Sequence, residues 1–201
     1  MAPPRHAAVL GCLEMLDQQG VIKLPEKRQS KQRFGPRIVH HERALDGPPI
    51  ETELSQIGPV QLEALDRGSQ DNEVWKASID KHHYLGYRQG FGHQLRYIIR
   101  DQQGRWLGGL MFEGITKHLP CRDRWIGWTD EQRNKPRHLV VCNSRFLIFP
   151  WVKVKNLGSC VLAQAARQLP QDWQQRYHCQ PVLMETFVDR RFRAHSYKGY
   201  Q

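Results

Sequence analysis

Hydrophobic and polar positions are patterned most clearly between residues 138 and 169, where two periodicities follow one another. Residues 139–149 form a nearly continuous apolar run that is interrupted only at 143–145, which is typical of a strand covered on both faces. Apolar residues then recur every four positions, as in an amphipathic helix, at Leu157, Val161, Ala165 and Leu169. Asn156 is the expected N-cap, and Pro170 is expected to end the helix. A central strand leading through a short loop into a helix N-terminus is a favourable place for an anionic ligand.

Weaker patterns on either side of this stretch predict the other elements of the same body. Residues 94–100 alternate as in a half-buried strand, and residues 105–113 form its hairpin partner after a turn. Gly108 and Gly109 in the partner strand indicate a bulge or a close approach of another group. The remaining expected elements are a helix over 72–84, a loop or short turn over 121–130 and a strand over 181–188. This order predicts an α/β (α+β) fold, built as a mixed sheet with flanking helices.

The first 72 residues have a different character. Residues 7–20 predict a helix with Gly20 as its C-cap and with one apolar face, formed by Ala8, Cys12, Met15 and Leu16. A short strand over 21–24 would make this piece similar to the closing half of a winged helix. The segment that follows is first basic and then acidic, with several Pro and Gly. The predicted division is a truncated N-terminal piece at 1–26, a linker at 27–72 and the α/β domain at 73–201.

Positive charge is concentrated in the second part of the chain. From Trp75 onward there are 21 Lys and Arg against 9 Asp and Glu, a net charge of +12. The first 74 residues have 9 against 11, a net charge of −2. A folded body with this surplus is expected to meet an acidic partner, most often nucleic acid. The alternative is that the surplus charge serves only solubility.

The five cysteines are scattered along the chain without a CxxC pair. This usage indicates reduced thiols in an intracellular protein. The sequence has no signal peptide and no apolar run long enough to cross a bilayer. We therefore expect a cytoplasmic protein with no membrane partner. Because no cluster of His, Cys, Asp or Glu has metal-ligand spacing, we expect no metal site.

The expected order of elements resembles the acyl-CoA-dependent N-acetyltransferase (GNAT) superfamily, which follows the same course of hairpin, central strand, helix and strand. In that superfamily the loop before the helix holds the cofactor pyrophosphate. The resemblance implies acetyl-CoA as the candidate cofactor, and the residues themselves establish none. The positions that would bind it are Lys155, Asn156, Gly158, Ser159 and Cys160.

A second resemblance rests on many short strings in one order. They are HYLG at 83–86, QLRY at 94–97, RDRWIGW at 122–128, NSRFLI at 143–148, PWV at 150–152, NL at 156–157, DW at 172–173 and ETFVD at 185–189. Together they resemble the DruA family, named after a component of the Druantia anti-phage system, whose domain also occurs beside or fused to transposases. Members usually carry further helices before this chain's start and a longer tail. We therefore expect a chain shortened at both ends.

Several residues in these strings are candidates for contact with nucleic acid. Arg122, Arg124, Trp125 and Trp128 place guanidinium and indole groups side by side, a mixture that suits phosphate contact and base stacking. The alternative is an Arg–Asp pair beneath a core Trp. Arg145 interrupts the central apolar run, where an unpaired polar group is costly, so a role in a site or a polar network is expected.

The candidate catalytic residues are His83, Tyr84 and Glu185. His83 and Tyr84 end the helix expected over 72–84, where packing is the alternative to acid–base or stacking roles. Glu185 has apolar neighbours on its expected strand, which favours a shifted pKa and a role as a base. The alternative for Glu185 is a salt bridge to Arg145 or Arg96.

The function predicted from these observations is a defence- or mobile-element-associated protein that binds nucleic acid. Two alternatives remain: a GNAT-like acyl-CoA-dependent transferase, and a non-catalytic subunit that works with other defence proteins or a transposase. Whether the chain is an enzyme stays open at this point.

Overall fold

The computed structural model describes residues 15–23, 41–88, 90, 92–129, 131–132 and 136–188. The chain divides into two compact units, residues 1–38 and 39–201. In the first unit residues 15–18 are helical, and Gly20 adopts a positive φ of 68° while its N–H donates to the Asp17 carbonyl. Gly20 is thus the C-cap that the sequence predicted. Residues 21–23 do not form the predicted strand, and Ala8 and Cys12 lie outside the described residues.

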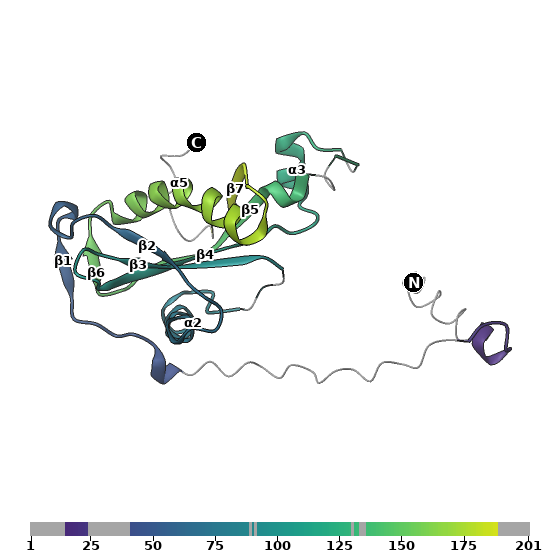
Figure 1. Cartoon of the computed structure of the whole chain (residues 1–201), viewed down its shortest axis with the longest axis horizontal. Coiled ribbons are helices and arrows are strands. Elements are labelled where there is room, and N and C mark those ends of the chain that lie inside the picture. The colour runs from purple at the N-terminus through teal and green to yellow at the C-terminus, as the bar shows by residue number, and fades with distance from the viewer. Residues whose placement is uncertain are drawn as a thin grey trace. The chain divides into compact units, whose positions relative to one another are not determined.

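A five-stranded sheet forms the centre of the second unit (Figure 1). Its strands, in spatial order, are β2 (Gln61–Ala64), β3 (Gln94–Arg100), β4 (Trp106–Gly114), β5 (Val140–Ile148) and β7 (Leu183–Thr186). The first four run antiparallel to their neighbours, whereas β7 is parallel to β5. The prediction of a mixed sheet is therefore confirmed. A separate parallel pair joins β1 (Ile50–Thr52) to β6 (Val152–Val154), so the region expected as a linker supplies both β1 and β2.

Two helices cover opposite faces of this sheet (Figure 1). They are α2 (Gln70–His82) and α5 (Leu157–Tyr177). A short helix, α3 (Pro120–Ile126), lies near one end of the sheet. The 3-10 turns are η1 (His41–Arg43), η2 (Leu54–Gln56) and η3 (Pro136–Leu139). Within the described residues, no helix has both the length and the apolar composition needed to cross a membrane.

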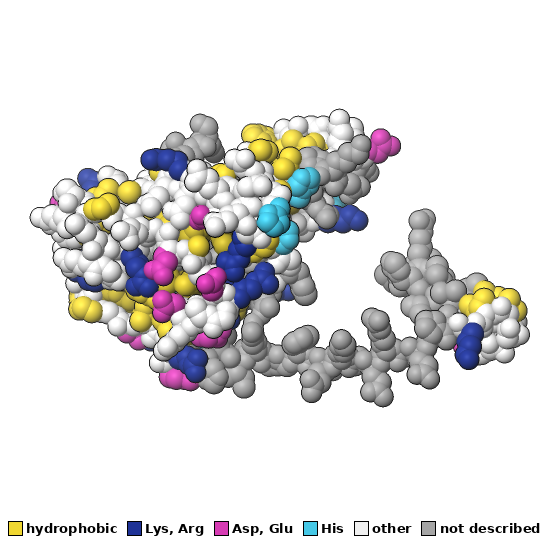
Figure 2. Space-filling view, viewed as in Figure 1, with side chains coloured by type: hydrophobic (Ala, Val, Ile, Leu, Met, Phe, Trp, Pro, Cys, Tyr) yellow, Lys and Arg dark blue, Asp and Glu magenta, His cyan; other side chains and the backbone are white. Residues whose placement is uncertain are grey.

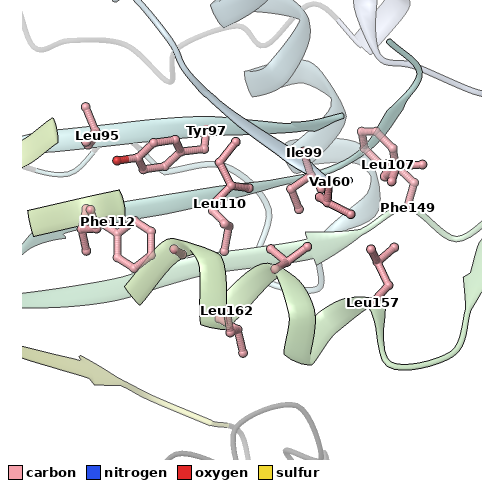
Figure 3. Packing of buried hydrophobic residues seen from close by; sticks show 14 of the residues in the cluster. Val60, Leu95, Tyr97, Ile99, Leu107, Leu110, Phe112, Phe149, Leu157 and Leu162 are labelled. Atoms are coloured by element: carbon pink, nitrogen blue, oxygen red, sulfur yellow. The ribbon is translucent and has the colours of Figure 1, made fainter. Parts of the chain in front are cut away.

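Alternate residues of β3 serve two hydrophobic cores. Tyr97 packs on the α5 side with Leu110, Phe112 and Leu162 (Figure 3). Ile98 packs on the other side with residues of α2, including Trp75. The expectation of a half-buried β3 is therefore wrong, because helices shield both of its faces from water.

Gly109 makes the close approach of α2 to the sheet possible. A Cβ atom added to Gly109 would overlap the indole Nε1 of Trp75, which donates a hydrogen bond of 3.0 Å to the Tyr97 carbonyl. Gly108, on the same strand, allows a similarly close approach of β5, since a Cβ atom on Gly108 would overlap the Leu147 carbonyl oxygen. The prediction of a close approach at this glycine pair is confirmed.

Two predicted boundaries are wrong. Helix α5 continues past Pro170 to Tyr177, because its apolar stripe extends to the buried Trp173 and this burial outweighs the missing proline N–H. Asn156 precedes the helix as expected, but it has a left-handed φ of 63° and its side chain makes no capping hydrogen bond. Residues 121–130 were expected as a loop or short turn, yet they contain most of α3, which Pro120 begins and Gly127 ends.

Candidate functional site

The parallel strands β5 and β7 separate partway along the sheet. They pair only from Val140 to Asn143 and from Leu183 to Thr186, after which β5 continues to Ile148 with β4 on one side and without β7 on the other. At the same point the register between β4 and β5 shifts, since Met111 faces Arg145 while Phe112 faces Asn143. The polar interruption at 143–145 therefore coincides with a bulge, and such features often redirect side chains beside functional sites.

A first pocket, here called the apolar pocket, lies where the two strands separate. It has a volume of about 350 Å³ and is lined by His82, His83, Tyr84, Asn143, Ser144, Phe146, Leu147, Thr186, Phe187 and Val188. Burial, together with the charge of Arg145, lowers the pKa of His83 to about 4. Its ring stacks on Tyr84 with centroids 4.7 Å apart, and Nδ1 accepts a hydrogen bond from the Leu85 N–H. A neutral His83 is thus a weak base at physiological pH.

A second pocket, here called the polar pocket, is lined by Leu85, Arg88, Gly90, Glu113, Gly114, Ile115, Thr116 and Arg145 and has a volume of about 570 Å³. Arg145 is held in place by two backbone carbonyls. Its Nε donates to Gly86 at 2.8 Å and its Nη1 donates to Ser144 at 2.6 Å. Burial lowers the pKa of this guanidinium. Arg145 makes no direct ion pair with a carboxylate of the described residues, and the carboxylate of Glu113, which lines the same pocket, interacts with it only at longer range.

Four side chains form a row across the sheet beside the polar pocket. The register aligns Gln94 of β3 with Glu113 of β4, Cys142 of β5 and Glu185 of β7. Burial and the two neighbouring carboxylates raise the pKa of Cys142 to about 12. The thiol therefore stays protonated and is no nucleophile at neutral pH.

Arg122 lies inside the protein, where its guanidinium binds two carboxylates. It donates to Asp123 at 2.9 and 3.0 Å and to Glu185 at 3.4 Å, and the three side chains are 5, 7 and 14% exposed. It also donates to the Thr116 carbonyl at 3.1 Å and lies 5.8 Å from the ring centroid of Trp128. The structure thus shows the Arg–Asp pair that was the alternative for Arg122, with the residue anchoring α3 to the sheet, and a contact of Arg122 with nucleic acid stays a prediction.

The predicted base, Glu185, is the second member of that ion cluster. Burial raises its pKa, although Arg122 opposes the shift. Its ion pair forms with Arg122 and not with the predicted partners Arg145 or Arg96. Arg96 instead binds Asn72, Gln94 and the hydroxyl of Tyr87. Glu185 does not line the apolar pocket with His83 and Tyr84, so the three predicted catalytic residues do not share one cavity.

The neighbouring residues on α3 point outward. Trp125 is 79% exposed, and Arg124 is exposed beside it. Tyr84 and Phe187, at the rim of the apolar pocket, are also exposed aromatic residues. Elsewhere the basic surplus is partly neutralised, as where Arg100 pairs with Glu63, and Figure 2 shows basic and acidic side chains intermingled on the face in view. Exposed aromatic residues, more than a surplus of positive charge, therefore distinguish the end of the sheet near α3 from the rest of the described surface.

The predicted cofactor loop leads into α5. Lys155 and Asn156 are exposed, whereas Gly158, Ser159 and Cys160 are half-buried. The Cys160 N–H donates to the Asn156 carbonyl at 3.0 Å, and its side chain packs against the main core. Among the described residues, no group of three or more His, Cys, Asp or Glu is arranged to hold a metal ion.

Glu113 and Gln94 are the members of the site that sequence reasoning missed. Each lies on a correctly predicted strand, but only the cross-strand register pairs Gln94 with Glu113, which lines the polar pocket with Arg145. The QLRY string at 94–97 was the available signal for Gln94.

A comparison with models of protein families identifies a match to this chain. The model described as "Druantia protein DruA" matches residues 16–195. No curated protein matches the chain, and no solved structure does.

Proposed function

The chain belongs to the DruA family, which associates it with Druantia anti-phage defence, and in that context we propose that it binds single-stranded nucleic acid at the end of the sheet where α3 lies. The observation that carries the proposal is the exposure of Trp125 beside Arg124 on α3. An exposed indole offers a face on which any base can stack, and a neighbouring guanidinium can reach the phosphate backbone.

The anchoring of α3 supports this role. Because Arg122 joins the helix to Glu185 of β7 and to the Thr116 carbonyl, the exposed Trp125 is presented on a fixed support. A stacking group that is already held in place loses less conformational freedom when a base binds.

The surroundings provide further contacts of the same kind. Tyr84 and Phe187 are exposed aromatic residues, and Arg88 and Lys117 are exposed cations without ion-pair partners among the described residues. Single-strand binders combine aromatic and basic side chains of this kind, since stacking on an aromatic ring tolerates any base. Duplex DNA would leave these aromatic groups without unstacked bases to contact.

Fluorescence polarisation of labelled single strands tests the proposal. Affinity should fall with salt, with a log–log slope of about 0.7 for each neutralised phosphate. Trp125→Ala should weaken binding by about 1–3 kcal/mol without changing that slope, and Arg124→Ala should lower the slope by about 0.7. The control is Arg167→Ala, which removes an exposed cation from α5. Absence of binding at low ionic strength, or unchanged binding by both α3 variants, would refute the proposal.

The second candidate is an acyl-CoA-dependent transferase with a GNAT-like arrangement. It is favoured by the separation of the parallel strands β5 and β7, which leaves the apolar pocket between them, and by the start of α5 shortly after β5. The N–H groups of a helix N-terminus can hold a pyrophosphate, and Lys155 would add charge there. Calorimetry with acetyl-CoA tests this candidate, and Gly158→Glu should abolish the heat of binding. A folded protein that gives no heat at millimolar acetyl-CoA excludes it.

A further inference from the structure

The polar pocket contains a cation whose hydrogen-bonding capacity is only partly used. Arg145 donates from Nε and Nη1 to backbone carbonyls, but Nη2 makes no hydrogen bond with the described residues. A guanidinium carries five N–H donors, and one that is partly withdrawn from water, with donors unused and no carboxylate paired directly to it, favours an anion at those donors. Arg88 lines the same pocket and is exposed, which gives the mouth of the pocket a second cation.

Unused polar atoms also lie at the wall formed by β3 and β4. Gln94 is 5% exposed, and its Nε2 has no hydrogen-bond partner within the described part of the chain, although its Oε1 accepts from Arg96 at 2.7 Å. The backbone of Gly90 lies close against this wall. A Cβ atom added to Gly90 would overlap Glu113 Oε2 and lie 2.6 Å from Gln94 Nε2. A buried donor without a partner costs about 1–3 kcal/mol. Among the described residues, the Nε2 of Gln94 is such an unpaired donor, and it lies beside Glu113.

These groups require a ligand with two different ends. The guanidinium groups of Arg88 and Arg145 suit an anion, whereas the carboxylate of Glu113 accepts only from N–H or O–H donors and repels an anion. Inorganic phosphate would satisfy the first end alone, and a neutral nucleoside only the second. The volume of about 570 Å³ lies within the range of small-molecule sites.

We propose that the polar pocket binds one nucleotide unit, with its phosphate at Arg88 and Arg145 and its base or sugar donors at Glu113. This inference deepens the proposed function, because the unit can belong to the strand held at Trp125. A free nucleotide presents the same chemistry, and the experiment separates the two sources.

Calorimetry on the full chain, with nucleoside 5′-monophosphates, the matching nucleosides and inorganic phosphate as ligands, tests the inference. At least one monophosphate should bind about tenfold or more tightly than its nucleoside and than phosphate, as expected for an added charged hydrogen bond. Arg88→Ala should remove this advantage, and Glu113→Gln should weaken that monophosphate and its nucleoside alike. Both variants keep the Gly86 and Ser144 contacts of Arg145, and Arg167→Ala serves as the control.

Competition with a labelled strand identifies the source of the nucleotide. Displacement of the strand by the monophosphate places a strand unit in the pocket, whereas binding without displacement indicates a free nucleotide. If strands bind but no monophosphate does at millimolar concentration, this inference fails and the proposed function stands. If monophosphates bind but strands do not, the proposed function fails. Equal affinity for nucleoside and monophosphate, or unchanged binding by both variants, would also overturn the inference.

Discussion

Replacing Arg122 by Ala should unfold the protein much more easily, although the adjacent Arg124→Ala should not. The substitution leaves Asp123 and Glu185 without the cation that donates to both, in a site where all three side chains are at most 14% exposed. Breaking a buried ion pair in this way costs about 3–5 kcal/mol. For a chain of this size, that loss corresponds to a fall in Tm of roughly 6–20 °C. Arg124 lies on the surface, where substitutions change stability by at most about 0.5 kcal/mol.

Thermal unfolding followed by circular dichroism checks this prediction. Measurements at several pH values add a second test. The stranded carboxylates become easier to protonate once Arg122 is removed, so the difference from wild type should shrink as the pH falls toward 4. Equal Tm values for wild type and Arg122→Ala at neutral pH would refute the assignment of Arg122 to a buried anchor. So would an equal loss of stability in Arg124→Ala.

Two further predictions concern the sheet and the end of α2. Gly109→Ala should destabilise the protein by about 1–3 kcal/mol in urea denaturation, because the added Cβ atom overlaps Trp75. Gly114→Ala on the same strand is the control: its Cβ atom meets no described atom within 4 Å, so its free energy of unfolding should be nearly unchanged. Because the pKa of His83 is lowered, its neutral form should contribute to the free energy of unfolding. This contribution is fully present above pH 6.5 and should disappear as the pH falls toward about 4. His83→Gln should remove this pH-dependent contribution. An imidazole of His83 that titrates near 6.5 by NMR would contradict this second prediction.

Local patterns predicted much of the fold. The alternation over 94–100 gave the bounds of β3 correctly, and the apolar run over 139–149 located β5, because both signals depend only on neighbouring residues. Pro170 was misleading because its local cost is outweighed by the burial of Trp173, which is a tertiary effect. The edge strand β2 was missed because its four residues are recognisable only when β3 is beside them.

The candidate site was less predictable than the fold. Trp125 and Arg124 were identified from their residue types and are exposed as a contact role requires. Arg122 and Arg124, two residues apart, looked equivalent in the sequence. Arg122 is buried whereas Arg124 is exposed, because the turn of α3 directs Arg122 toward Glu185. Glu113 and Gln94 became visible only through strand register, which a single sequence does not specify and which a bulge at Met111 and Phe112 shifts just before Glu113.

Photochemical crosslinking of a bound single strand most directly tests the claim that the protein holds nucleic acid at α3. Strands that contain 5-bromouracil react with aromatic side chains that stack on the modified base, and mass spectrometry of the digested protein locates the adduct. The account predicts that the main adduct lies on Trp125, that it is lost in Trp125→Ala and that it persists in Arg167→Ala. A strand that binds but crosslinks elsewhere, with Trp125 unmodified, would contradict the account.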